Sequence, residues 1–313
     1  MPVLNTVVTM TVTVFEADAA TELSAIAIDP LAAAPRGMWS GHSVRVTRHG
    51  NLHHRHDHRE GLCTNRFCVQ RRGGILSVDH DLTSDELCDE LAVLLVDELV
   101  ETGAIRGRAE FELVFTGVVR STVDGGMAAW LRFYRNSLRK LEAGATPFSP
   151  IHHRAEELVV GPNLIDLGSC FGFFPLRMAQ HGTDVLATDL SAPTMDLLDQ
   201  VSNRLRRPVR TMSCNAASVP LPDGAADTVT ALHLIEHLTP DVADAVVREA
   251  LRLARRRVVV AVPFEEEPRT CYGHVQRFDL PALQSMAAQL CSAHTGLRAT
   301  VAEHHGGWLI LDR

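Results

Sequence analysis

The chain has 313 residues, of which 46% are hydrophobic and 22% charged, and its formal net charge is -8. This length and apolar content suit one large and one smaller hydrophobic core, and they exclude a single small module or a disordered chain. The net acidity argues against a broad nucleic-acid interface, because phosphate binding needs a basic surface. We therefore expect a two-part globular protein with no nucleic-acid partner.

The start of the chain is rich in Ala, Thr and Val, contains acidic residues and lacks the basic start of a secretory signal. We expect a disordered leader over residues 1–37. The sequence contains no apolar run as long as a membrane span, and its seven cysteines form no regular framework. These patterns predict a cytoplasmic protein with reduced thiols and no membrane partner.

Between residues 39 and 81, short alternating segments are separated by polar loops, which predicts a small antiparallel sheet. One loop is rich in imidazoles and thiols: His49, His53, His54, His56, His58, Cys63 and Cys68. Imidazole and thiolate are zinc ligands, so residues 49–68 are an alternative metal site. Their spacing matches no familiar zinc arrangement, and the preferred interpretation is a solvated loop without metal.

The next segments form the rest of an N-terminal α+β accessory region. Thr83 and Glu86 have the spacing of a helix-capping box, and leucines at helical spacing follow until Gly103, which predicts one helix over residues 83–103. Residues 106–123 are interpreted as strands and residues 127–141 as a second helix. Residues 38–147 are expected to cover the substrate.

Residues 163–174 and 185–189 contain a buried strand, a turn with glycines, a helix and a second strand that ends in an acid. Gly168 suits a tight turn, Gly172 suits close helix packing, and Asp189 lies where a ribose hydroxyl would bind. This order predicts a nucleoside site, although Cys170 stands where a dinucleotide fingerprint has glycine.

A second motif begins at residue 215 and reads Asn-Ala-Ala-Ser-Val-Pro-Leu-Pro-Asp-Gly-Ala-Ala-Asp. Together the motifs resemble those of class I S-adenosylmethionine-dependent methyltransferases, Asp/Glu-x-Gly-x-Gly-x-Gly and Asp-Ala-x-x-Leu-Pro-Phe-x-Asp-x-x-Phe-Asp. The residues that match are Asp166, Gly168, Gly172, Ala216, Pro220, Asp223 and Asp227, while Asn215 replaces the usual acid and Ala226 the usual aromatic. The resemblance covers residues 148–313.

This resemblance implies S-adenosylmethionine as the cofactor. Its methionine moiety would pass over residues 168–172, with Asp166 near the amino group. Asp189 would accept hydrogen bonds from the ribose hydroxyls, and Asn215 would accept one from the adenine amino group. The expected cofactor-binding residues are Asp166, Gly168, Ser169, Cys170, Gly172, Phe173, Asp189, Leu190, Asn215, Ala216 and His233.

Residues 233–237 also fit the His-x-x-Glu-His pattern of inverted zinc proteases. Such a protease needs the pattern on a helix, so that both imidazoles face one metal. Residues 227–234 instead indicate an apolar strand that becomes a loop near Glu236. We therefore expect His233 near the cofactor, Glu236 and His237 in the reaction cleft, and no metal.

After a predicted helix over residues 240–254 and a buried strand over 257–263, a loop with three consecutive acids and His274 is expected to cover the active site. His274 is the preferred general base for a hydroxyl acceptor, because imidazole titrates near neutrality. His237 is second, and residues 265–267 are third, as a base or metal anchor. The expected catalytic residues are His274, His237 and Glu236.

The closing segments, residues 297–302 and 308–311, have the form of two strands joined by a glycine turn. They agree with the antiparallel edge hairpin that ends the sheet in the resembled family. We predict an α/β fold for residues 148–313, a doubly wound and mostly parallel seven-stranded sheet, with methyl transfer at the carboxyl ends of the strands.

Low aromatic content, at 5%, and net acidity favour a small or sugar hydroxyl as acceptor over nucleobases or phosphate-rich molecules. The His-rich front and residues 169–175 are similar to the mycofactocin oligosaccharide methyltransferases of actinobacteria, which implies O-methylation of a glucose on a peptide-derived redox cofactor. The alternatives are a methyltransferase for another small metabolite, a dinucleotide-dependent oxidoreductase and a non-catalytic nucleoside-binding module. The oligomeric state is left open.

Overall fold

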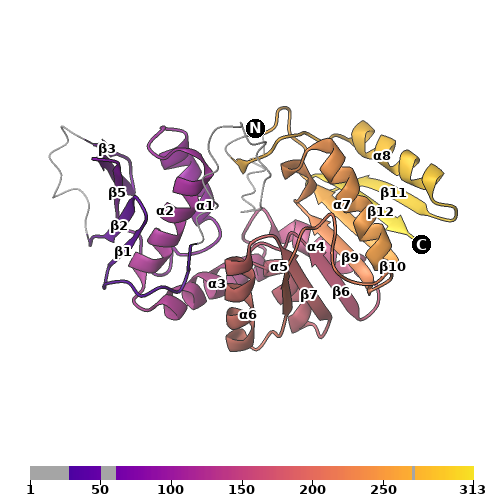
Figure 1. Ribbon diagram of the computed structural model, residues 1–313, viewed down its shortest axis with the longest axis horizontal. Coiled ribbons are helices and arrows are strands. Elements are labelled where there is room, and N and C mark those ends of the chain that lie inside the picture. Colours follow the sequence, from indigo (N-terminus) through magenta and orange to yellow (C-terminus); the bar gives the residue numbers. More distant parts are fainter. Residues whose placement is uncertain (1–27, 51–60, 270–271) are drawn as a thin grey trace. The chain divides into compact units, whose positions relative to one another are not determined.

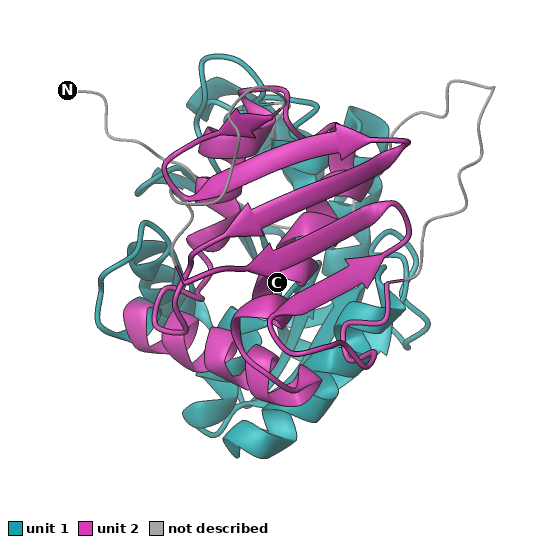
Figure 2. Ribbon diagram, turned by 90° about the vertical axis from the view of Figure 1, so that its left-hand side faces the viewer, with its two compact units in different colours: residues 1–16, 141–313 teal, residues 17–140 magenta. Residues whose placement is uncertain are grey.

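The computed structural model describes residues 28–50, 61–269 and 272–313 (Figure 1). Within these residues the chain divides into two compact units, one up to Lys140 and the other from Leu141 onward (Figure 2). The two units are described separately below. In the described ranges, no helix combines the length and the apolar character that crossing a membrane requires.

The first unit contains a five-stranded sheet of order β1-β2-β5-β4-β3. Its strands are β1 (Met38–Gly41), β2 (Val44–Arg48), β3 (Leu62–Cys63), β4 (Phe67–Arg72) and β5 (Ile75–His80). All neighbours are antiparallel except β2 and β5, which are parallel. The predicted antiparallel sheet is therefore wrong at its centre, because the β3–β4 pair lies beyond β5 and β5 returns beside β2 in the same direction.

The helices of this unit are α1 (Leu91–Leu95), the π-helical turn η1 (Val96–Val100), α2 (Gly107–Thr122) and α3 (Gly126–Glu142). The predicted helix over 83–103 starts too early. The Glu86 carboxylate does accept hydrogen bonds from Thr83, at 2.8 Å from the backbone nitrogen, but it also pairs with Arg66, and only a turn forms there.

The strands predicted over residues 106–123 are wrong, because this segment is α2. Every residue from Leu113 to Ser121 is buried, so this part of the helix has no exposed polar face with which to show a helical period. Its β-branched residues mimic a buried strand. Gly117 allows α2 to approach the sheet closely, because a Cβ at this position would overlap Val46 of β2.

Part of the predicted disordered leader is held in place. Arg120 of α2 donates to the carbonyls of Pro30 and Ala32 at 2.7 and 2.6 Å, and the Trp130 indole donates to Pro30 at 2.8 Å. The prediction of a disordered leader is therefore wrong for these residues, because three donors satisfy their carbonyls. Residues 1–27 lie outside the described residues.

The second unit contains a seven-stranded sheet of order β11-β12-β10-β9-β6-β7-β8. Its strands are β6 (Asn163–Leu167), β7 (Asp184–Asp189), β8 (Arg210–Ser213), β9 (Ala226–Leu232), β10 (Ala254–Val262), β11 (Arg298–Glu303) and β12 (Gly307–Asp312). Strands β6 to β10 are parallel, and β12 is antiparallel to both β10 and β11. The predicted doubly wound, mostly parallel sheet with an edge hairpin is confirmed.

The chain reverses its direction of winding between β6 and β9, which are neighbours at the centre of this sheet. The helices are α4 (Ser149–Leu158), α5 (Phe173–Gln180), α6 (Ala192–Leu205), the 3-10 turn η2 (Ile235–His237), α7 (Pro240–Leu253) and α8 (Leu280–Ala293). Because crossovers are right-handed, α5 and α6 lie on one face and α7 on the other. A ligand site is expected at this switch point, beyond the carboxyl ends of the strands.

Candidate active site

The turn after β6 has a backbone that favours glycine. Gly168 and Gly172 both have φ 68°, and Cys170 also has a positive φ, of 49°. A Cβ at Gly168 would lie 2.6 Å from a methyl group of Leu234, and one at Gly172 would overlap Leu198 of α6. The two glycines therefore satisfy a conformational and a steric requirement together.

Asp189, at the end of β7, organises this turn from the neighbouring strand. Its carboxylate is buried and accepts hydrogen bonds from the backbone nitrogens of Cys170 at 3.0 Å and Ser191 at 2.9 Å. Ser169 adds a backbone hydrogen bond to Thr188, at 2.8 Å, and its hydroxyl donates to the Asp166 carbonyl at 3.0 Å. The turn and the ends of β6 and β7 thus form one fixed framework.

Asp166 is a second buried carboxylate beside this framework, at 4% exposure. Burial raises its pKa to about 6, hydrogen bonds from Thr230 and Ser169 oppose that shift, and the charge of Asp189 adds to it. None of the described residues forms an ion pair with Asp166. The edge of the sheet therefore presents a carboxyl group that a cationic ligand would stabilise in its ionised form. Thr230 was not singled out from the sequence, because it is one of three polar residues along β9.

The other predicted cofactor residues lie at the ends of neighbouring strands. Leu190 follows β7 and is 50% exposed, which is unusual for a leucine of this unit. Asn215 is exposed after β8, and its side-chain oxygen accepts from the Ala217 nitrogen at 2.9 Å. Ala216 packs at the margin of the core, and Phe173 is buried at the start of α5. The fold brings them to the same edge as Asp166 and Asp189.

His233 lies in the bend between β9 and η2, with φ 53°. Its backbone nitrogen donates to the Ala261 carbonyl of β10 at 2.8 Å, and its Nδ1 lies 3.2 Å from a Glu236 oxygen. Phe148 contacts the imidazole edge-on at a centroid distance of 5.6 Å. Phe148 was not singled out from the sequence, because no motif includes it.

The three predicted catalytic residues come together although His274 is distant in sequence. The rings of His237 and His274 are 4.7 Å apart between centroids, and one ligand-type atom from each of Glu236, His237 and His274 lies within 4.8 Å of the others. The Nδ1 of His274 donates to Glu265 at 2.7 Å, and that of His237 to the Gly273 carbonyl at 3.3 Å. All three side chains are buried.

Gln276 anchors the loop that carries His274 onto η2. Its side-chain nitrogen donates to the carbonyls of Ile235 at 2.9 Å and Leu238 at 2.7 Å. The Val275 nitrogen adds a bond to the Glu236 carbonyl at 2.9 Å. Sequence reasoning missed Gln276, since a glutamine in a polar loop gives no signal of its partners.

The electrostatics of this cluster follow from burial. Burial lowers the pKa of His237 to about 4, and Glu236 opposes this shift. Burial alone would raise the pKa of Glu236, but His233, with His237 and His274, brings it below its usual value. The imidazole of His237 is therefore neutral, and the carboxylate is ionised, at neutral pH.

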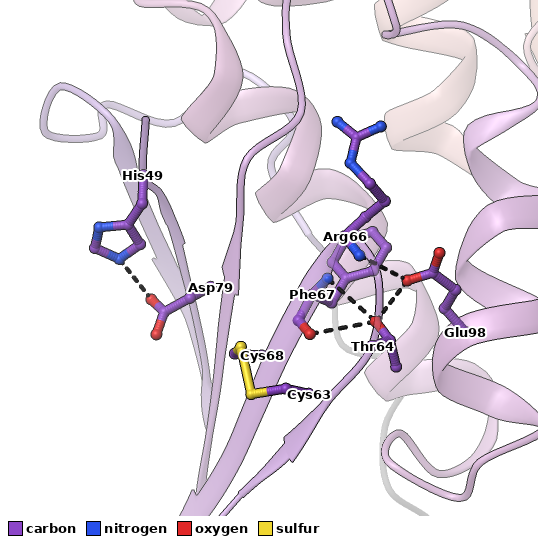
Figure 3. The surroundings of a disulfide bond; sticks show 8 residues. All are labelled: His49, Cys63, Thr64, Arg66, Phe67, Cys68, Asp79 and Glu98. Carbon is purple, nitrogen blue, oxygen red and sulfur yellow. Dashed lines mark hydrogen bonds and ion pairs between the residues drawn. A yellow bond between two sulfur atoms is a disulfide. The ribbon is translucent and has the colours of Figure 1, made fainter. Parts of the chain in front are cut away.

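The alternative metal site over residues 49–68, in the first unit, has no free thiolates. Cys63 of β3 and Cys68 of β4 are register partners with Cα atoms 4.2 Å apart, and they form a disulfide (Figure 3). His49 instead contacts Asp79, at 3.0 Å between nitrogen and oxygen. The prediction of reduced thiols is wrong for this pair, because strand pairing brings the two residues together. His53, His54, His56 and His58 lie outside the described residues.

Residues 165–262 match the protein-family model described as "Methyltransferase domain". No curated protein matches the chain. Among solved structures, the chain is similar to a SAM-dependent methyltransferase from Aquifex aeolicus, with 17% identity, 56% of this chain and 97% of that chain covered, and a TM-score of 0.41. It is also similar to magnesium protoporphyrin IX methyltransferase from Synechocystis PCC 6803, with 17% identity, coverage of 58% and 85%, and a TM-score of 0.41.

The family match and the strand order identify the second unit as a class I methyltransferase domain. The chain thus contains a methyltransferase domain, and S-adenosylmethionine is the methyl donor of this class of domain. The residues at the sheet edge fit this group, because a cationic amino group matches the buried Asp166 and hydroxyl groups match the acceptor oxygens of Asp189.

Proposed function

We propose that this enzyme transfers the methyl group to a hydroxyl of a small or glycosylated acceptor. The observation that carries the proposal is the meeting of His237, His274 and Glu236 in a buried cluster next to the glycine turn. Leu234, two residues before Glu236, packs directly on that turn at Gly168. The imidazoles and the carboxylate, which can accept and donate protons, therefore lie close to the residues expected to bind the methyl donor.

Asp166 would hold the amino group of the cofactor, and residues 168–173 would line its methionine moiety. Asp189 would bind the ribose hydroxyls. The adenine would contact Leu190, Asn215 and Ala216. The exposed Leu190 would offer an apolar surface, and the side-chain oxygen of Asn215 would accept a hydrogen bond with its second lone pair. His233 would lie beside the cofactor. The cofactor supplies an electrophilic methyl group, and the protein residues orient both reactants around it.

His274 is the preferred proton acceptor for the attacking hydroxyl. Glu265 accepts a hydrogen bond from its Nδ1, at 2.7 Å, so that Nε2 is the basic nitrogen. His237 has the same arrangement with a backbone carbonyl and is second, and residues 265–267 are third. If His274→Ala retained near-normal turnover with unchanged cofactor binding, His274 would have no catalytic role.

The acceptor is proposed to be a small metabolite or a sugar in the cytoplasm. The similarity of the His-rich front and of residues 169–175 to mycofactocin oligosaccharide methyltransferases makes a glucose-bearing acceptor the first to test. Other small hydroxyl compounds come next.

Calorimetric titration with S-adenosylmethionine, S-adenosylhomocysteine and NAD tests the cofactor assignment. We expect micromolar binding of the first two, no binding of NAD, and loss of binding in Asp189→Ala. Release of S-adenosylhomocysteine is then measured with glucosides and other hydroxyl compounds. Binding without turnover on any acceptor would favour the alternative, a non-catalytic nucleoside-binding module.

A further inference from the structure

The cluster beside η2 contains buried polar atoms that the described residues leave without hydrogen bonds. They are the Nε2 atoms of His237 and His274, both oxygens of Glu236 and the Nδ1 of His233, which lies 3.2 Å from one of those oxygens as an ion-pair contact. Glu236, His237 and His274 are 1%, 0% and 2% exposed. A buried polar atom without a partner costs about 1–3 kcal/mol, so the other Glu236 oxygen and the two Nε2 atoms, which lie in one place, need a common explanation.

The opposite nitrogens of both imidazoles are engaged. The Nδ1 of His274 donates to the nearly buried Glu265, and that of His237 donates to the Gly273 carbonyl. An imidazole whose Nδ1–H is held by a carboxylate or a backbone carbonyl directs the lone pair of Nε2 outward. Metal-binding histidines have this arrangement, because the outer partner fixes both the tautomer and the ring orientation.

We infer that Glu236, His237 and His274 bind a divalent transition-metal ion, with Glu265 and Gly273 as supporting hydrogen-bond acceptors. Two imidazoles and one carboxylate are a donor set of zinc and of other first-row metals. Ligand atoms bound to one zinc ion lie about 3–4 Å from each other, so the observed 4.8 Å limit requires only a small side-chain movement. Three protein ligands leave at least one coordination position open.

This site differs from the one suggested by the His-x-x-Glu-His pattern. The third ligand is His274, from the loop after β10, while the Nδ1 of His233 faces Glu236 at 3.2 Å. The site also departs from the expectation of no metal, which rested on the spacing of residues 49–68 and on the absence of a predicted helix at residues 233–237. The tertiary contact between residues 236 and 274 could not be predicted from the sequence, because these residues are far apart along the chain.

The role of the ion rests on the proposed function. A bound divalent cation lowers the pKa of an oxygen ligand. An acceptor hydroxyl in the open position would therefore lose its proton at a lower pH than the same hydroxyl without the ion. The cluster would then activate the acceptor through the ion rather than by His274 acting as a free base. Metal binding itself does not depend on this role.

The test is titration of chelator-treated full-length protein with zinc chloride, followed by calorimetry and by metal analysis after gel filtration. The starting variant replaces His53, His54, His56 and His58 by Asn, because these imidazoles lie outside the proposed site and could also bind zinc. We expect one tight equivalent, whose affinity falls by 100-fold or more in His237→Ala, His274→Ala and Glu236→Gln. The double variant His304→Ala/His305→Ala, which removes an exposed imidazole pair, should retain it.

Glu265→Gln offers a milder check, because weakening the outer hydrogen bond should lower zinc affinity by about 10–100-fold without removing a ligand. Circular dichroism and S-adenosylhomocysteine binding show whether each variant is folded. If folded Glu236→Gln and His274→Ala bind zinc as tightly as the starting variant, or if that variant binds no zinc, the metal site is refuted. Either result leaves the methyltransferase assignment intact, since cofactor binding is measured separately.

Discussion

Gly172 and Gly182 have similar left-handed backbones but different surroundings. Their φ values are 68° and 86°, and a Cβ would overlap Leu198 only at Gly172, while nothing lies within 4 Å at Gly182. Gly182→Ala should therefore lose about 1–2 kcal/mol from backbone strain alone. Gly172→Ala should lose about 1–3 kcal/mol more from overpacking, together with cofactor affinity. Urea unfolding followed by Trp308 fluorescence in a Trp39→Phe/Trp130→Phe background measures both losses, and equal losses would contradict the steric requirement.

The raised pKa of Asp166, about 6, predicts how cofactor affinity depends on pH. Its carboxyl must be ionised to pair with the amino group of the cofactor, so below pH 6 binding has to release a proton. We expect the affinity for S-adenosylhomocysteine to be flat above about pH 7 and to fall by up to tenfold per pH unit below 6.

Calorimetry from about pH 5 to pH 8 measures this dependence. Asp166→Asn should bind more weakly and should show a flatter profile, because it has no proton to release. A wild-type profile as flat as that of the variant would show that Asp166 does not pair with the amino group.

At the residue scale, the sequence predicted positions that belong to a local motif. Gly168, Gly172 and Asp189 occupy their expected places because the strand, turn and helix that hold them are contiguous. Thr230, Phe148 and Gln276 were missed because their partners come from other strands and loops. Tertiary contacts of this kind leave no spacing in the sequence.

The packing of β5 against α2 includes a buried neutral histidine. His80 accepts a hydrogen bond at Nδ1 from the Leu82 nitrogen, at 3.2 Å, and its Nε2 donates to the Ser121 hydroxyl at 2.8 Å. Burial, followed by nearby positive charges, lowers its pKa to about 3. Its contribution to stability is complete above the unfolded-state pKa of 6.5 and is lost as pH falls toward 3. We expect a loss of about 1.4 kcal/mol per pH unit in that window.

Denaturant unfolding at several pH values, followed by Trp39 and Trp130 fluorescence in a Trp308→Phe background, checks this slope. Ser121→Ala should reduce stability by a similar amount at every pH and keep the slope, whereas His80→Asn should make it shallower. An unchanged slope in His80→Asn would assign the acid sensitivity to other groups.

The loop that carries His274 depends on Gln276 for its position on η2. Gln276→Ala removes two donors and leaves the carbonyls of Ile235 and Leu238 without them, a loss of about 1–3 kcal/mol in local stability. We expect faster hydrogen exchange over residues 264–278 and a lower kcat, with cofactor affinity unchanged. Val275→Ala, which shortens an exposed side chain of the same loop, is the control. Unaltered exchange and turnover in Gln276→Ala would exclude the anchoring role.

Elements were predictable where a strand or helix showed its own period. The strands β6, β7, β9 and β10, the helix α7 and the β11–β12 hairpin were all recognised in the sequence. The α2 segment was not, because burial on every side removes the helical period, and the parallel β2–β5 pair depends on the order of strands in space. The disulfide depends in the same way on the pairing of β3 with β4.

At the scale of the whole molecule, all residues proposed to bind the cofactor belong to the second unit, while the first unit has its own buried core around Phe115, Trp130 and Phe133. A ligand that binds only a folded unit stabilises that unit by about 2.7 kcal/mol at a concentration 100 times its Kd. Saturating S-adenosylhomocysteine should therefore shift the unfolding midpoint reported by Trp308 in a Trp39→Phe/Trp130→Phe variant. The midpoint reported by Trp39 and Trp130 in Trp308→Phe should move much less. Equal shifts of both midpoints would mean that the two units unfold as one cooperative body, and the acceptor specificity of the enzyme would then have to be studied in the intact chain.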